Sequence, residues 1–296
     1  MTELYSGVFP VLATPFDLAG QIDEESLRNL ARFTIKAGAD GMTVGGVASE
    51  VYKLSDGERR RVTEIVLQEA GGRVPVWVGT GHACTELAVE HTKHAERTGA
   101  AGAMVMPPYA MKASLAGVAS YFRAIGRAVA IPVMIQDAPL VSGVHLPVDF
   151  LTTLAHEVPN IAYVKVEAPP TGPKIGDVIA RAKERLRVFG GLGGGNLIDE
   201  LKRGAVGTLP GSAFPEAYVD IYRRFRTGAV SEAERLHRRI LPLIRFTSQS
   251  VEFSFHGYKR ILKHRGAIAT AYVRQPSATF DEAAEEELRS LLPLIE

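Results

Sequence analysis

The chain has 296 residues, with 34 Lys and Arg against 33 Asp and Glu, and a formal net charge of +1. Hydrophobic residues make up 46% and charged residues 23%, a composition typical of globular proteins and not of disordered ones. The balanced charge gives no general attraction to nucleic acid or to an anionic membrane surface. We therefore expect neither nucleic acid nor a membrane as a partner.

Features that would direct the chain out of the cytoplasm are missing from the sequence. No apolar run approaches the roughly 20 residues that span a bilayer. Residues 1–5 lack a basic stretch followed by an apolar core, so no signal peptide is predicted. Cys84 is the single cysteine and therefore forms no internal disulfide. We expect a cytoplasmic protein.

Short apolar runs recur along the chain and alternate with amphipathic helical patterns. Most runs are continuously apolar, which is typical of parallel strands buried on both faces. Their starts lie roughly 30 residues apart, the size of one strand–helix unit. The predicted strands are residues 7–13, 41–44, 74–79, 103–106, 131–135, 161–166, 188–190 and 207–209.

The helices between these strands have recognisable ends. Asp23 and Thr85 are predicted N-caps, and Ser55 with Glu58 forms a capping box. A Gly-Ala-x-Gly pattern ends three helices, because its first glycine accepts the left-handed conformation that terminates a helix. This pattern occupies residues 38–41, 99–102 and 204–207.

About eight such units make a closed (β/α)8 TIM barrel, which is the predicted α/β fold class. An open doubly wound sheet would need fewer units or a break in their spacing. We predict a barrel over residues 1–228 and an extension over residues 229–296 whose helices pack on the barrel. The predicted helices of the extension are residues 231–245, 256–263 and 280–292, with Thr279 or Asp281 starting the last.

A buried lysine is the most informative candidate for chemistry. Reactive groups in such barrels come from the C-terminal ends of strands, and Lys165 lies within the apolar strand 161–166. Burial disfavours the ammonium form and supplies the free amine that attacks a carbonyl. The alternative is a structural lysine whose tip reaches water. Glu167 faces the same side of the strand as Lys165 if the strand continues. Its alternative roles are a salt-bridge partner of the lysine, a proton-transfer group or a solvated loop residue.

Glycine-containing loops follow two of the strands. The loop at residues 45–50 brings backbone amides and the Ser49 hydroxyl to a small anion such as a carboxylate, although glycine also serves ordinary turns. The loop at residues 190–195 suits phosphate binding, close approach of a substrate, or simple packing.

Two further loop residues are candidates for proton transfer. His82 and Tyr109 follow strands, and each is suited either to donating a proton or to a structural role. The histidines form no i, i+4 pair around an acid of the kind that binds zinc. We predict neither a metal nor another cofactor.

Taken together, several positions resemble one family, that of dihydrodipicolinate synthase and N-acetylneuraminate lyase, which are class I lyases of the pyruvate type. The resemblance runs from about residue 7 to the C-terminus. The matching segments, in this order and spacing, are residues 13–16, 46–50, 54–55, 58–59 and 107–109, Lys165, residues 204–207 and residues 258–266.

The resemblance implies a cofactor-free enzyme in which Lys165 forms a Schiff base with a small 2-keto acid. It also implies a homodimer or homotetramer in which Tyr109 is shared across an interface. The loop at residues 47–49 would hold the substrate carboxylate, and Leu209 would line the site. The candidate catalytic residues are Lys165, Tyr109, Gln136 and Glu167, and the candidate substrate-binding residues are Gly46, Val47, Ala48, Ser49, His82, Gly191 and Leu209.

The chain departs from the family pattern in three places. The usual Gly-Thr-Thr-Gly-Glu loop reads Gly-Val-Ala-Ser-Glu at residues 46–50, and Gln136 replaces a tyrosine whose phenolic proton it cannot relay. Val141 stands where dihydrodipicolinate synthases carry an arginine for the second substrate. Residues 134–139 and 163–167 look instead like the 2-keto-3-deoxy-L-arabonate dehydratase branch, as do His82 and residues 107–109.

The resulting hypothesis is a Schiff-base lyase that dehydrates a 2-keto-3-deoxy sugar acid. One enzyme alternative is a retro-aldolase that releases pyruvate, and another is 4-hydroxy-tetrahydrodipicolinate (dihydrodipicolinate) synthase. A rarer one is an aldolase for a phosphorylated substrate, with residues 193–195 as the anion cradle. The non-enzyme alternative is a barrel that binds a keto acid without turnover.

Overall fold

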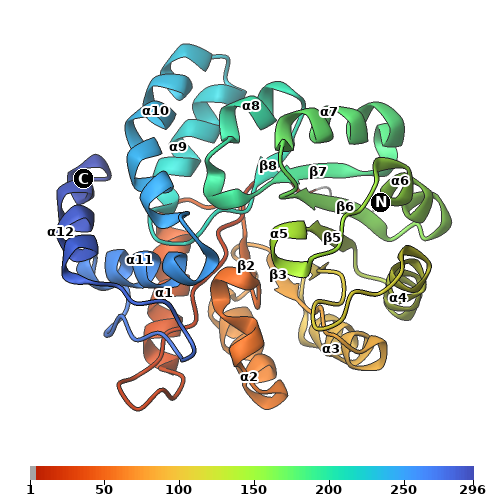
Figure 1. Cartoon of the computed structure of the whole chain (residues 1–296), viewed down its shortest axis with the longest axis horizontal. Coiled ribbons are helices and arrows are strands. Elements are labelled where there is room, and N and C mark those ends of the chain that lie inside the picture. Colours follow the sequence, from red (N-terminus) through yellow and green to blue (C-terminus); the bar gives the residue numbers. More distant parts are fainter. Residues whose placement is uncertain (1–4) are drawn as a thin grey trace.

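The computed structural model describes residues 5–296, and the N-terminal residues on which the signal-peptide prediction rests lie largely outside this range. Within the described residues, eight parallel strands alternate with helices around a barrel (Figure 1). The strands are β1 (Gly7–Val8), β2 (Met42–Val44), β3 (Val76–Gly79), β4 (Gly102–Val105), β5 (Val133–Asp137), β6 (Ile161–Val166), β7 (Arg187–Gly190) and β8 (Gly207–Thr208).

The sheet closes between its first two strands. Its order runs from β1 through β8 and β7 back to β2, so that each later strand pairs with its neighbour in sequence. Val11, beyond the end of β1, forms parallel bridges with both Thr43 and Gly211. The Leu12 N–H donates to the Thr43 carbonyl over 2.8 Å. The predicted (β/α)8 barrel is therefore confirmed, with regular pairing over only two residues of the predicted strand 7–13.

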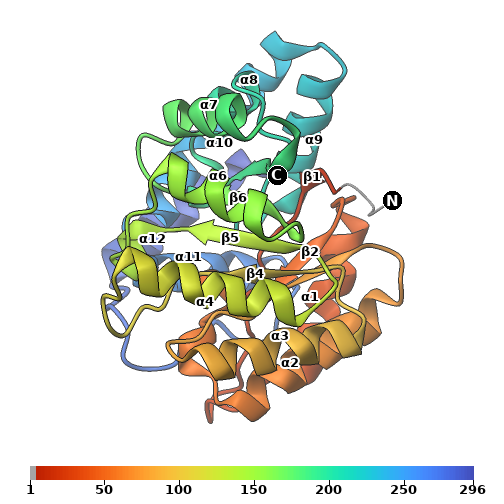
Figure 2. The same ribbon diagram turned by 90° about the vertical axis from the view of Figure 1, so that its right-hand side faces the viewer.

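The helices lie outside the strands, as Figure 2 shows for α3, α4 and α6. The helices associated with the barrel are α1 (Glu24–Lys36), α2 (Asp56–Ala70), α3 (Thr85–Thr98), α4 (Leu115–Ala128), α5 (Pro139–Ser142), α6 (Val148–Glu157), α7 (Thr171–Ala182), α8 (Leu197–Lys202) and α9 (Pro215–Arg226). The C-terminal helices are α10 (Val230–Thr247), α11 (Val251–His264) and α12 (Glu282–Leu291).

Most of the predicted helix ends are confirmed. Asp23 caps α1, and Ser55 and Glu58 form the capping box of α2. The prediction for α3 was wrong by one residue, because Cys84 occupies the N-cap and Thr85 is already helical. Gly38, Gly99 and Gly204, which follow α1, α3 and α8, have φ values of 80°, 93° and 97°. These left-handed angles are the physical reason for the repeated glycine.

The C-terminal helices share a hydrophobic core with the barrel. Leu243 of α10, Ile261 of α11 and Leu288 of α12 belong to the same buried cluster as Val8 and Met42 of the barrel strands. Asp281 caps α12 and accepts from the Ala284 N–H. Over residues 5–296 no helix combines the length and the apolar character that crossing a membrane requires.

Candidate active site

Lys165 lies near the C-terminal end of β6, above the aromatic interior of the barrel. Tyr163, two residues earlier on the same face of the strand, packs with Phe9, Trp77 and Phe189 inside the barrel. This packing leaves the Lys165 side chain 4% exposed. In the sheet Lys165 pairs with Gln136 of β5, so both side chains reach the same end of the barrel interior. The strand pattern therefore predicted the position of the lysine correctly.

Glu167 holds three hydrogen-bond donors at one carboxylate. Its Oε1 lies 3.0 Å from the Lys165 Nζ and accepts from the Leu192 N–H over 3.2 Å. Its Oε2 accepts from the Gln136 Nε2 over 2.8 Å. The set suits an ionised carboxylate, which accepts at both oxygens and donates at neither. Lys165, Glu167 and Gln136 thus form one connected group, and each of the three lines the same cavity.

The cavity opens above this group and has a volume of about 610 Å³. That size lies within the range of sites for small molecules, which is about 300–1,000 Å³. Val11, Val47 and Leu209 form part of its wall from the barrel side. The lysine is therefore in an ion pair that faces a cavity, where a carbonyl compound can approach its amine.

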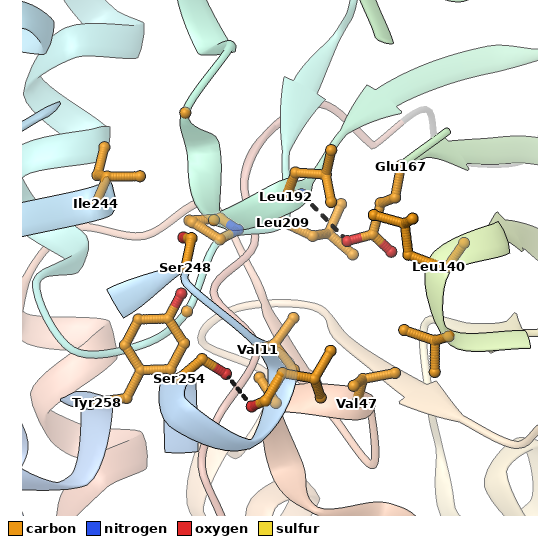
Figure 3. Close-up of a pocket in the computed structure, with 18 of the residues that line it drawn as sticks. Val11, Val47, Leu140, Glu167, Leu192, Leu209, Ile244, Ser248, Ser254 and Tyr258 are labelled. Atoms are coloured by element: carbon orange, nitrogen blue, oxygen red, sulfur yellow. Dashed lines mark hydrogen bonds between the residues drawn. The ribbon is translucent and has the colours of Figure 1, made fainter. Parts of the chain in front are cut away.

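Helices α10 and α11 supply the opposite wall. Tyr258 and Ser254 of α11 lie across the cavity from Glu167, which directly follows β6, with Leu209 and Val11 between them (Figure 3). The loop between these helices adds Ser248 and its neighbour residue 249. The C-terminal helices are thus part of the site itself.

The loop at residues 47–49 is a single turn of 3-10 helix at the rim of the cavity. Val47 and Ala48 line the cavity, and their N–H groups are the first of the turn, which lack intrahelical partners. The Ser49 hydroxyl donates to the Leu12 carbonyl over 2.6 Å and accepts from the Gly46 N–H. Ser49 is fully buried, so in this structure its side chain holds the loop, and its contact with a substrate stays a prediction.

Two of the predicted glycines touch the site through their backbone. A Cβ atom on Gly191 would lie 2.7 Å from both the Lys165 Cε and the Glu167 Oε1, so a side chain there would displace the reactive group. Gly46 packs against Val11, and a Cβ would approach its Cγ1 to 2.8 Å. Close packing at these glycines is therefore a sufficient reason for their presence.

Tyr109 and His82 do not line this cavity. Tyr109 is half-buried and lies near Arg59 and Tyr121. His82 accepts at Nδ1 from the Cys84 N–H over 3.1 Å, and its own N–H donates to the Tyr121 hydroxyl. The catalytic role of Tyr109 and the substrate contact of His82 therefore stay predictions.

A second histidine near His82 makes the fold sensitive to acid. His91 of α3 is buried and lies 3.0 Å from an Asp56 carboxylate oxygen. Burial lowers the pKa of His91 from its usual 6.5 to about 4. The unfolded chain, in which His91 has its usual pKa, therefore binds a proton more readily than the folded chain. The stability contributed by neutral His91 is lost as the pH falls from about 6.5 towards 4.

We expect the free energy of unfolding at pH 5, relative to pH 7.5, to fall by about 2 kcal/mol more in the wild type than in H91Q. Glutamine keeps a donor for Asp56 but does not titrate. Urea denaturation at the two pH values measures the difference. Equal losses in the two proteins would contradict the assignment.

Several residues of the site escaped the sequence reasoning. Leu192 donates its N–H to Glu167 from a left-handed conformation with φ of 47°, which is unusual for a leucine. Tyr258 and Ser254 come from a helix that is distant in sequence from β6. The match to residues 258–266 was a signal for this helix, but it did not indicate that the helix faces the cavity.

A (β/α)8 barrel with a lysine, a carboxylate and a cavity at the C-terminal ends of its strands has the architecture of an enzyme. The model of the dihydrodipicolinate synthetase family matches residues 4–294. The chain belongs to this family and is a lyase of it. The family resemblance predicted from the sequence is thus confirmed.

Relatives in the family have different activities. L-2-keto-3-deoxyarabonate dehydratase of Azospirillum brasilense is 31% identical, over 99% of this chain and 97% of the relative. The 4-hydroxy-tetrahydrodipicolinate synthase of Acidobacterium capsulatum is also 31% identical, over 97% and 94%. YagE of Escherichia coli K12, a member of the same family solved in complex with pyruvate, superposes with a TM-score of 0.89 at 26% identity, over 99% of each chain.

Proposed function

We propose that the protein is a class I lyase that forms an imine between Lys165 and a 2-keto-3-deoxy sugar acid and eliminates water from it. The observation that carries the proposal is the contact between a buried lysine amine and a carboxylate, 3.0 Å apart, inside a cavity of ligand size. A lysine amine in such a position forms Schiff bases with carbonyl compounds.

The first step joins substrate and enzyme. The Lys165 amine attacks the C2 carbonyl, and loss of water leaves an iminium that draws electrons from C3. The N–H groups of Val47 and Ala48, which lack intrahelical partners at the start of the turn, support binding of the C1 carboxylate. No metal is required in this step, because the positive nitrogen serves as the electron sink.

The second step removes a proton from C3. Glu167 is the candidate base, because its carboxylate contacts the lysine nitrogen to which C2 is bonded. The electron pair left on C3 forms an enamine with the imine carbon and nitrogen. When the enamine reverts to an iminium, a C3–C4 double bond forms and the C4 hydroxyl leaves as water, with a proton from Glu167. Hydrolysis of the remaining iminium releases the product and restores the amine.

Gln136 holds Glu167 in place and does not titrate. Its Nε2 donates to the Glu167 Oε2, and its side chain is 4% exposed. The proposal therefore assigns Gln136 to orienting the carboxylate or a substrate hydroxyl. In the proposed reaction Glu167 transfers the proton. In dihydrodipicolinate synthases the resemblance implies that a tyrosine, at the position of Gln136, does so.

Val141 supports the choice of substrate. It lines the cavity at the position where dihydrodipicolinate synthases, in the resemblance described above, carry an arginine. An apolar side chain gives no ion pair to a second carboxylate.

A retro-aldol cleavage keeps the same imine and differs in removing the proton of the C4 hydroxyl and breaking the C3–C4 bond. Product analysis with 2-keto-3-deoxy-L-arabonate separates the two reactions, and faster turnover of pyruvate with aspartate semialdehyde would reverse this ranking.

The role of Glu167 has a separate test. We expect E167Q to lower kcat for dehydration by about 10²- to 10⁴-fold, the usual contribution of a general base. Because Lys165 remains, borohydride should still trap pyruvate on the variant. Turnover by E167Q within threefold of the wild type would exclude Glu167 as the base. Q136A, which keeps the carboxylate and removes its support, should show a smaller loss.

A further inference from the structure

A buried carboxyl group lies behind the glycine-rich loop, outside the group that the proposed reaction uses. Glu200 of α8 has 0% of its surface exposed. Its Oε1 accepts from the Thr171 hydroxyl over 2.8 Å, and this hydroxyl accepts from the Asn196 side chain. Its Oε2 has no hydrogen-bond partner within residues 5–296. A buried polar atom without a partner is costly, and therefore suggests a function.

Two consecutive glycines separate Glu200 from the reactive lysine. A Cβ on Gly190 would lie 1.8 Å from the Glu200 Oε2, while a Cβ on Gly191 would lie 2.7 Å from the Lys165 Cε. Gly190 pairs in the sheet with Val166, the residue between Lys165 and Glu167. The Glu200 carboxyl therefore lies behind the same two-glycine stretch of backbone that packs against the Lys165 side chain.

The charged groups near Glu200 come from α8 and from the C-terminal end of β6. Asp199 lies beside it on α8, and Lys165 of β6 and Glu167, which directly follows β6, interact with it electrostatically. Gly190 of β7 carries no charge, and the buried His237 of α10 is directed to a backbone carbonyl of the glycine-rich turn. Among these groups Lys165 carries the positive charge.

We propose that Glu200 is a positioning residue of the lysine site, whose carboxylate stabilises the positive charge on the Lys165 nitrogen through the glycine backbone. This inference rests on the imine of the proposed function. The proposed arrangement requires glycine at both positions. A side chain at Gly190 would displace Glu200, and a side chain at Gly191 would displace Lys165.

Ionisation of Glu200 gives the effect a direction with pH. Burial raises the pKa of this carboxyl to about 7, while the Thr171 hydrogen bond opposes the rise. Below pH 6 Glu200 is neutral and contributes little to the iminium. Above pH 8 it is an anion and favours the iminium, so its contribution appears as the pH rises through 7.

The test uses pyruvate and needs no knowledge of the natural substrate. Imine formation exchanges the methyl protons of pyruvate with solvent deuterium, which NMR follows in the intact enzyme. We expect the ratio of wild-type to E200Q exchange rates to be near 1 at pH 5.5. The ratio should reach about tenfold at pH 8.5, as expected for a charge separated from the amine by one layer of backbone in a partly screened interior.

Two matched variants distinguish this effect from a structural one. T171V removes the donor to Glu200 and should move the midpoint of the pH dependence upward, because the anion loses a hydrogen bond. D199N removes the adjacent, exposed carboxylate, whose negative charge raises the pKa of Glu200, and should move the midpoint downward, opposite to T171V.

The outcomes are separable. A pH-independent ratio for E200Q overturns the inference, and if E200Q does not fold, an unshifted midpoint in T171V overturns it. Absence of pyruvate exchange and of borohydride trapping in the wild type would instead overturn the proposed function, on which the inference depends.

Discussion

Replacing Lys165 with methionine is expected to lower kcat/KM for the keto-deoxy acid by about 10⁴-fold or more, as removal of a covalent nucleophile does elsewhere. Methionine fills a similar volume without an amine. The loss should appear together with a complete loss of pyruvate trapping by borohydride. Steady-state kinetics and intact-protein mass measurement test the two expectations on the same preparation.

Lys174 offers a matched control for this variant. It is also partly buried and ion-paired, with its Nζ 2.6 Å from the Asp137 Oδ2. K174M should lose stability but retain the pyruvate adduct, since Lys174 does not line the cavity. An adduct on K165M, or its loss in K174M with Lys165 intact, would show that the wrong lysine has been assigned.

The second large effect is a loss of stability, and it concerns a buried ion pair between the segment that follows the turn at residues 47–49 and the C-terminal helices. Glu50 follows the turn at residues 47–49, is fully buried and has a left-handed φ of 55°. Its carboxylate binds Lys259 of α11 and lies 3.1 Å from the Lys53 Nζ. Lys259 also donates to the Tyr272 carbonyl over 2.8 Å. This network joins the rim of the site to the C-terminal helices.

We expect K259M to lower the free energy of unfolding by about 3–5 kcal/mol, because it leaves a buried Glu50 carboxylate with one of its two cations. Urea denaturation measures the loss. K263M, which changes an exposed lysine on the same helix, should stay within about 0.5 kcal/mol of the wild type. The double variant E50Q/K259M should recover part of the loss, because it removes the unpaired charge.

The same variant has an expected effect on binding. Glu50 directly follows the turn at Val47 and Ala48, so loss of its ion pair should loosen that turn. We therefore expect K259M to raise KM for the keto acid more than it lowers kcat. A K259M protein with wild-type stability, or with kcat lost and KM unchanged, would contradict this account of the network.

The sequence predicted those parts of the site that depend on local periodicity. Lys165 was identified because an ammonium group is out of place in an apolar strand, and Glu167 because alternate residues share a face of the strand. The 3.0 Å contact between them is the structural counterpart of that two-residue spacing. The barrel itself followed from the regular spacing of strand–helix units.

Contacts between distant segments were beyond such reasoning. Glu200 lies on a short helix between buried leucines, and its packing behind β7, which isolates the carboxyl from water, joins segments that the local sequence does not connect. Lys259 reaches Glu50 across 209 positions of the sequence. The hydroxyl of Ser49, a candidate for substrate contact, donates to the carbonyl of Leu12 in the structure. Each of these contacts is set by tertiary packing, which a single sequence does not encode in a readable pattern.

Reduction of the wild-type enzyme with borohydride in the presence of pyruvate, followed by tryptic peptide mapping, tests the central claim most directly. A secondary amine at residue 165 blocks cleavage there, so the account predicts one modified peptide spanning residues 128–174. The same peptide should be labelled when 2-keto-3-deoxy-L-arabonate replaces pyruvate. A label on any other lysine, or no label with either keto acid, would contradict an imine at Lys165.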